Sequence, residues 1–134
     1  MRLLGVTAGG IALVTFIFSV LVEFIGFPVV YNSGVAFGVN IPEPFQTAAI
    51  LAALVVVIRL GLHTRNRLEV FGFGCIIGGA CANIIDRLID GVVTDMLRIG
   101  MFPVFNAADA AIAFGVAVVL LIQGRGALEN IFTK

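Results

Sequence analysis

The chain has 134 residues, of which 60% are hydrophobic and 12% charged, against about 45–50% and about 25% in an average soluble domain. Its 8 basic and 8 acidic side chains give a formal net charge of zero, so it lacks the basic surface that binding to a nucleic acid requires. The composition therefore excludes a water-soluble globular domain and predicts no nucleic-acid partner.

Four stretches are long and apolar enough to be predicted as membrane-spanning helices, because crossing about 30 Å of hydrocarbon takes about 20 apolar residues. They are residues 3–22, 45–62, 68–88 and 107–123. No linker or repeat of fixed period divides the chain, and no small-x-small cleavage site follows the first stretch. We therefore predict an all-α integral membrane protein, with one four-helix domain over residues 1–134 and a small, reduced β or loop element outside the membrane.

Charged residues predict how these helices are oriented. Most basic residues fall on one side of a four-helix arrangement, namely Arg2, Arg59, Arg65, Arg67, Arg125 and Lys134. Most acidic residues fall on the other side, namely Glu23, Glu43, Asp86, Asp90, Asp95 and Asp109. Basic loops mark the cytoplasmic side of a membrane protein. Both termini are thus expected in the cytoplasm, and polar chemistry is expected at the outer face.

Small residues follow one side of the third span. Gly74, Gly78 and Ala82 stand four residues apart, a pattern that lets two helix backbones approach closely within a membrane. Cys75 and Cys81 lie in the same apolar stretch but on different sides of the helix. We interpret both as reduced packing residues, because two cysteines so placed do not form a disulfide framework.

A polar face closes the third span, where Asn83, Asp86, Arg87 and Asp90 stand at relative positions 0, 3, 4 and 7. Ionisable side chains in or near a membrane usually face the bundle interior or a functional site. The simpler interpretation is a salt bridge between Asp86 and Arg87 that orients the neighbouring loops.

Two further acids follow this face. Asp95 lies in a short β-branched segment after Gly91, which predicts an extended connection. Asp109 lies three residues after Asn106 and resembles the acid of a capping box that opens the fourth helix. Helix capping alone explains Asp109, but it does not explain a second acid delivered to the same membrane face.

Paired carboxylates have a known chemical use. Because two like charges close together cannot both ionise cheaply, the pair shares a proton, and one acid activates water while the other polarises a carbonyl. The sequence offers no nucleophilic Ser or Cys with a nearby base. A cation site from Asp86, Asp90 and Asp95 is the alternative, without a His cluster or EF-hand spacing to favour it. We predict aspartic proteolysis, with no metal and no cofactor.

An outer segment around Tyr31–Gly38 contains Asn32 and Gly34. Asn and Gly at this spacing suit a turn. The functional interpretation is an edge that holds an extended peptide near the acids.

Four blocks in this order resemble signal peptidase II, the bacterial prolipoprotein signal peptidase. They are Asn32–Phe37, Gly78–Leu88, Gly91–Asp95 and Phe102–Asp109. The resemblance implies an endopeptidase of the bacterial inner membrane that cuts a prolipoprotein just before its diacylglyceryl-modified cysteine. Its expected partners are this lipid-modified substrate and membrane lipids, and the protein is expected to be a monomer.

The resemblance also implies roles for individual residues. Asp95 and Asp109 match the catalytic pair of the family. The substrate-binding and supporting positions match Asn32, Gly34, Asn83, Asp86, Arg87 and Asn106.

Two departures from the family pattern leave another function open. The first span lacks the usual Asp-Gln-x-x-Lys motif, for which Glu23 is only a partial substitute, and the stretch from that span to Asn32 is short. The alternative is therefore a non-catalytic membrane scaffold that keeps the lipid-peptide groove. The sequence lacks the broken-helix pairs and the inverted repeat that would favour a channel or transporter.

Overall fold

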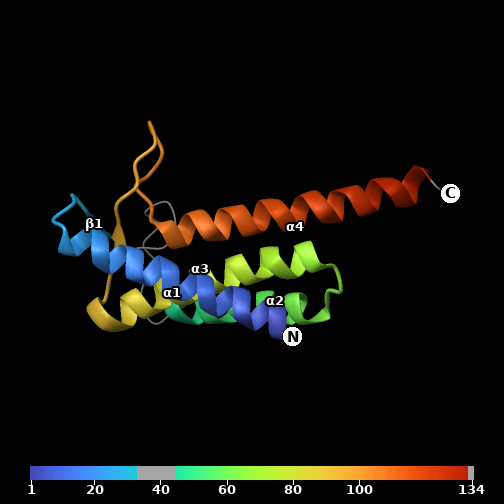
Figure 1. The fold of residues 1–134 in the computed structure, drawn as a ribbon, viewed down its shortest axis with the longest axis horizontal. Coiled ribbons are helices and arrows are strands. Elements are labelled where there is room, and N and C mark those ends of the chain that lie inside the picture. Colours follow the sequence, from blue (N-terminus) through green and yellow to red (C-terminus); the bar gives the residue numbers. More distant parts are fainter. Residues whose placement is uncertain (33–44, 133–134) are drawn as a thin grey trace.

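A computed structural model describes residues 1–32 and 45–132. Its elements in chain order are α1 (Arg2–Phe24), β1 (Val30–Asn32), α2 (Phe45–His63), α3 (Arg67–Asp90), β2 (Val93–Asp95) and α4 (Ala107–Phe132). The helices lie alongside one another, and both termini lie toward the end of the molecule opposite β1 (Figure 1). The predicted fold class, a helical membrane protein with a small β element, is confirmed.

Three helices are long and apolar enough to cross a membrane within the described residues, namely α1, α3 and the Ala107–Glu129 part of α4. The described apolar stretch of α2, Thr47–His63, is shorter. The fourth helix extends to Phe132, beyond the predicted end at residue 123. Hydropathy marks where a helix leaves the hydrocarbon, whereas the helix itself continues because no proline follows to stop it.

The helix α3 is the centre of the bundle and packs chiefly against α1 and α4. In its most apolar stretch 44% of the residues are buried, against 17% in α1 and in α4. A core cluster joins Leu4 of α1, Phe73 and Ile77 of α3, and Val119 of α4. The outer sides of α1 and α4 are therefore left to face lipid.

Glycines let α3 approach α1. A Cβ at Gly74 would lie 2.6 Å from Cβ of Thr7, and a Cβ at Gly78 would lie 2.5 Å from the carbonyl oxygen of Ala8. No side chain larger than hydrogen fits at these positions without a shift of α1. The interpretation of Gly74 and Gly78 as a close-packing stripe is confirmed.

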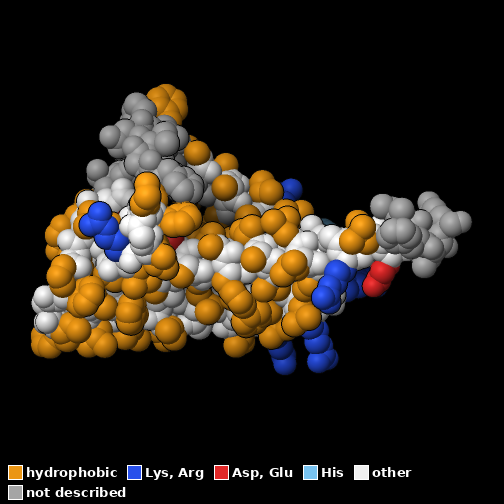
Figure 2. Space-filling view, turned by 90° about the horizontal axis from the view of Figure 1, so that it is seen from above, with side chains coloured by type: hydrophobic (Ala, Val, Ile, Leu, Met, Phe, Trp, Pro, Cys, Tyr) orange, Lys and Arg blue, Asp and Glu red, His pale blue; other side chains and the backbone are white. Residues whose placement is uncertain are grey.

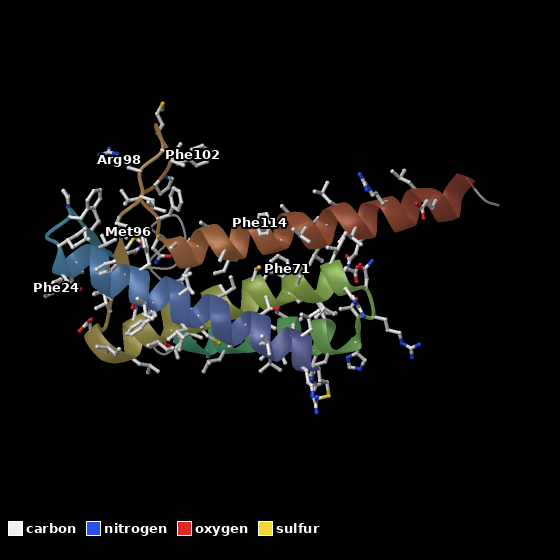
Figure 3. The ribbon with its side chains drawn as sticks, viewed as in Figure 1. Phe24, Phe71, Met96, Arg98, Phe102 and Phe114 are labelled. Atoms are coloured by element: carbon white, nitrogen blue, oxygen red, sulfur yellow. The ribbon has the colours of Figure 1, made fainter. Side chains whose placement is uncertain are left out.

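A second small-residue contact lies between α3 and α4 and was missed from the sequence. A Cβ at Gly79 would collide with the carbonyl oxygen of Ala108, and one at Gly115 would collide with the carbonyl oxygen of Gly72. Next to this contact Phe71 and Phe114 pack edge to face, with ring centroids 6.4 Å apart (Figure 3). Spacing of seven residues between Gly72 and Gly79 was the available signal.

A left-handed glycine turns the chain from α3 into β2. Gly91, with φ of 76°, caps α3 and donates its backbone N–H to the Arg87 carbonyl, a geometry that glycine adopts without steric cost. The predicted extended segment then forms β2, which pairs antiparallel with β1 so that Val30 lies opposite Asp95. The sheet thus fixes Asp95 at the end of the bundle.

Hydrophobic side chains cover much of the flank, and Lys and Arg side chains gather toward the end that carries the C-terminus (Figure 2). On α4 the exposed apolar side chains include Phe114, Leu120 and Leu121. Such a band would be unfavourable in water but suits the hydrocarbon of a bilayer.

We expect Gly78→Ala to destabilise the protein by about 1–3 kcal/mol, the usual cost of overpacking a close contact. The matched control is Gly9→Ala, because nothing lies within 4 Å of a Cβ there; its effect should be neutral or slightly stabilising. Thermal unfolding in detergent micelles measures both. Equal stability of the two variants would show that α1 and α3 are not held at the described separation.

Candidate active site

The first turn of α4 positions Asp109. The Asn106 side-chain Oδ1 accepts the backbone N–H of Asp109 at 2.8 Å, while Oδ2 of Asp109 accepts the backbone N–H of Asn106 at 3.3 Å. This is the reciprocal capping box that the sequence predicts. It places the Asp109 carboxyl at a helix N-terminus, where the helix dipole favours a negative charge.

Asparagines connect this cap to α3. The Asn83 Nδ2 donates to Oδ1 of Asp109 at 2.8 Å, and Nδ2 of Asn106 donates to Oδ1 of Asn83 at 2.9 Å. Asn106 is only 2% exposed. Buried amides of this kind must be hydrogen-bonded, so the chain of contacts fixes which way each carboxylate and amide points. Capping therefore accounts for only part of the Asp109 environment.

Asp95, at the end of β2, is 2% exposed. Its Oδ2 accepts a hydrogen bond from Nδ2 of Asn32 at 3.0 Å. Its Oδ1 is buried and has no hydrogen-bond partner among the described residues. An unsatisfied buried acceptor calls for an explanation, and within residues 1–32 and 45–132 no donor meets this oxygen.

Burial raises the pKa of the Asp95 carboxyl, because removal from water disfavours its charged form. The hydrogen bond from Asn32 opposes this rise, and the negative charge of Asp109 adds to it. The two acids are therefore within electrostatic range of each other.

Asp86 and Arg87 lie beside the acids rather than between them. Oδ2 of Asp86 accepts the backbone N–H of Thr94 at 3.4 Å, and Nη1 of Arg87 donates to the Asn83 carbonyl at 3.4 Å. The Asp86 contact ties the end of α3 to β2, whereas the Arg87 contact stays within α3. The contribution of Thr94 comes from its backbone, so no side-chain pattern in the sequence could have indicated it.

Other predicted residues have different positions. Gly34 lies outside the described residues. Glu23 accepts the hydroxyl hydrogen bond of Tyr31 at 2.6 Å, which joins the end of α1 to β1. Asp90 is exposed at the end of α3.

The first span contains buried polar residues that the sequence analysis missed. Thr15 and Ser19 are each 8% exposed and stand four residues apart, so they share one side of α1. Oγ1 of Thr15 donates to its own helix, at the Ile11 carbonyl. Their i, i+4 spacing within an apolar span was the available signal.

Among the residues the structure describes, no group of three or more His, Cys, Asp or Glu side chains is placed to hold a metal ion. Within that part of the chain the polar site consists of carboxylates, amides and a guanidinium. Two acids in mutual electrostatic range, one held by amide and backbone donors and one buried with a raised pKa, are suited to moving protons to and from a substrate. Fold and site together define the class of protein: an integral membrane protein with an acid-pair site at one end of a helical bundle.

Comparison with known proteins identifies the family within that class. The sequence model of signal peptidase (SPase) II matches residues 6–124. The lipoprotein signal peptidase of Aquifex aeolicus is 37% identical over 123 residues, which cover 83% of this chain and 74% of that protein. That of Chlorobium luteolum is 33% identical over 122 residues, covering 80% and 73%. The chain belongs to the signal peptidase II family, and it is therefore a bacterial membrane protease.

Solved structures share the fold. One bacterial membrane enzyme superposes with a TM-score of 0.82 at 17% identity, covering 95% of this chain and 90% of its own. A second superposes with a TM-score of 0.72 at 21% identity, covering 87% and 92%. The arrangement of helices is thus kept although most of the residues differ.

We expect Asp95→Asn to raise stability at neutral pH. The pKa of Asp95 is higher in the folded protein than the ordinary value of 3.8 in the unfolded chain. The free energy of unfolding of the unsubstituted protein therefore falls as pH rises from 3.8 to the folded pKa, and at higher pH it stays at this lower level. Asn has no charge to desolvate and still accepts from Asn32. The gain should vanish below pH 3.8, as followed by thermal unfolding in micelles; a gain independent of pH would contradict the assigned cause.

Proposed function

We propose that this protein is an aspartic endopeptidase that removes the signal peptide of a prolipoprotein, with Asp95 and Asp109 as the catalytic pair. The observation that carries this proposal is the burial of Asp95 within electrostatic range of the hydrogen-bonded Asp109. One Asp95 oxygen also has no hydrogen-bond partner in the part of the chain that the structure describes. Membership of the signal peptidase II family, and relatives that are lipoprotein signal peptidases, support the substrate class.

The surroundings of the two acids give them different roles. Asp109 accepts hydrogen bonds from Asn83 and from the backbone of Asn106 at the start of α4, and such donors stabilise a carboxylate. Asp95 has a raised pKa because it is buried. From these surroundings we assign Asp109 as the base of the pair and Asp95, whose pKa is raised, as the acid.

The reaction follows from this division. Asp109 takes a proton from a water molecule as its oxygen attacks the scissile carbonyl carbon, and Asp95 gives its proton to the carbonyl oxygen. The tetrahedral intermediate then collapses, the C–N bond breaks, and the amine that leaves takes the proton held by Asp109. The hydroxyl proton of the intermediate returns to Asp95, so the pair is restored.

Other polar residues position the pair. Asn32 orients Asp95 from β1, and Asn83 with Asn106 orients Asp109. Asp86 holds the end of α3 against β2, and the positive charge of Arg87 acts on Asp95 and favours its charged form. These residues act on the acids rather than on the scissile bond. Gly34, from the first family block, is proposed to contact the substrate backbone.

Charge and topology support an outer site. Both termini and the connection between α2 and α3 lie toward the end of the molecule opposite the acids (Figure 1). Arg2, Arg65 and Arg67 lie at that end, and basic residues mark the cytoplasmic side. The acids then lie at the outer face of the inner membrane, where the lipid-modified cysteine of a precursor lies at the bilayer surface. We propose one domain over residues 1–134, acting as a monomer.

We expect Asp95→Asn and Asp109→Asn each to lose cleavage by at least about 100-fold, because positioned acid–base groups contribute about 10²–10⁴-fold. The assay uses the purified protein in vesicles with a lipid-modified precursor and measures the released signal peptide. Asp90→Asn is the matched control, an exposed acid at the same end that should keep activity.

Unchanged cleavage in either catalytic variant would refute the assigned pair. Absence of cleavage by the unsubstituted protein, folded and in the same vesicles, would favour the non-catalytic scaffold instead. Thermal unfolding of each variant verifies that it is folded.

We also expect a bell-shaped dependence of kcat/KM on pH. Activity should fall on the acid side as the pair takes up a second proton and on the alkaline side as it loses its last one. Because burial raises the pKa of Asp95, the alkaline limb should lie above the ordinary pKa of an aspartate. Initial rates across pH measure both limbs, and a monotonic profile would show that the acids do not share a proton.

A further inference from the structure

A short hairpin leaves the site between the two acids. Its base is an antiparallel bridge in which the Leu97 N–H donates to the Phe105 carbonyl at 2.7 Å and the Phe105 N–H donates back at 3.0 Å. Asp95 lies two residues before this bridge and Asn106 directly after it. The base is therefore held firmly, and it belongs to the site.

The tip of the hairpin carries apolar side chains that the rest of the described chain leaves uncovered. Ile99 is 63% exposed, Phe102 is 69% exposed and Met101 is fully exposed. A turn with Gly100 at φ of 55° and a hydrogen bond from the Phe102 N–H to the Ile99 carbonyl shapes the tip. Three large exposed apolar side chains within four residues of one projecting turn are costly in water, because water contacts the apolar surface of each.

The direction of the hairpin identifies what covers it. The hairpin leaves the bundle sideways, at the level of the first turn of α4 (Figure 1). Because α4 crosses the membrane along its own axis, an element that leaves sideways at its first turn runs along the membrane surface. The helix α4 itself carries exposed apolar side chains, among them Phe114 and Leu120, as expected of a helix that faces lipid.

The charge at the hairpin fits the same surroundings. Arg98 is exposed beside the apolar tip, and both Arg98 and Phe102 lie on the projecting part (Figure 3). A cation next to aromatic and aliphatic side chains is the composition of segments that bind at the bilayer interface, where the cation meets lipid phosphates.

We propose that the Ile99–Phe102 tip inserts into the headgroup and upper acyl region of the outer leaflet and anchors the hairpin there, with Arg98 on the lipid phosphates. The anchor holds both strands of the hairpin base, and so the segments of Asp95 and Asn106, at a fixed depth. This consequence for the acids rests on the proposed function, whereas the anchor itself does not.

The chain contains no Trp, so single Trp substitutions report on one site each. In vesicles of phosphatidylglycerol and phosphatidylcholine, we expect Phe102→Trp to emit at shorter wavelength than in the unfolded chain. Its emission should resist iodide and should be quenched more by lipids brominated near the headgroup than by lipids brominated near the chain end. Leu120→Trp, at an exposed position within the span of α4, is the control and should show the reverse preference for bromine depth.

Met101→Trp provides a second reporter. Because the Met101 side chain is fully exposed, this substitution should leave the fold intact even if Phe102→Trp unfolds the protein. Emission that iodide quenches and lipid bromine does not would place the tip in water and overturn the anchor. Emission shielded from iodide but indifferent to lipid bromine would mean that protein, such as a second copy, covers the tip, and would overturn it equally. Neither readout depends on cleavage, so failure of the anchor and failure of the protease are separate results.

Discussion

The central constraint on this molecule is the cost of placing two carboxyl groups at one end of a helical bundle, where Asp95 is buried and Asp109 is half-buried. Each acid obtains its partners from a distant part of the chain. Asp109 is served by Asn83 and the backbone of Asn106, and Asp95 by Asn32. The two acids therefore have different hydrogen-bond surroundings within the described residues, and burial raises the pKa of Asp95.

The packing of α3 against α1 and α4 sets the geometry of the hydrogen bonds around Asp109. Gly74 and Gly78 bring α1 close on one side, and Gly79 brings the Ala108 backbone close on the other. Ala108 precedes Asp109, so the separation of α3 and α4 sets how far the Asn83 amide must reach. A site built from short amide side chains tolerates little change in that separation, since hydrogen bonds weaken steeply with distance and angle.

Much of the fold was predictable because its signals are local. Apolar length predicts the helices, and the Asn106 and Asp109 pair predicts the start of α4 as a capping box. The face shared by Asn83 and Asp86 follows from the 3.6-residue period. Less was predictable where local signals end. Hydropathy stops at residue 123 while α4 continues to Phe132, and the seven-residue spacing of Gly72 and Gly79 does not say which helix packs against them.

The sequence by itself determined the residue types, the helices that carry them and the membrane end at which they gather, because periodicity and hydropathy act over a few turns of one chain segment. Only the tertiary structure decided that Asn32 meets Asp95, 63 residues away, and that Ile99–Phe102 projects sideways from the bundle. It also decided that one Asp95 oxygen has no donor among the described residues, whereas Asp109 accepts hydrogen bonds from Asn83 and Asn106. These are properties of packing between segments, and no period within a single helix or strand encodes which segments come together or how much water they exclude.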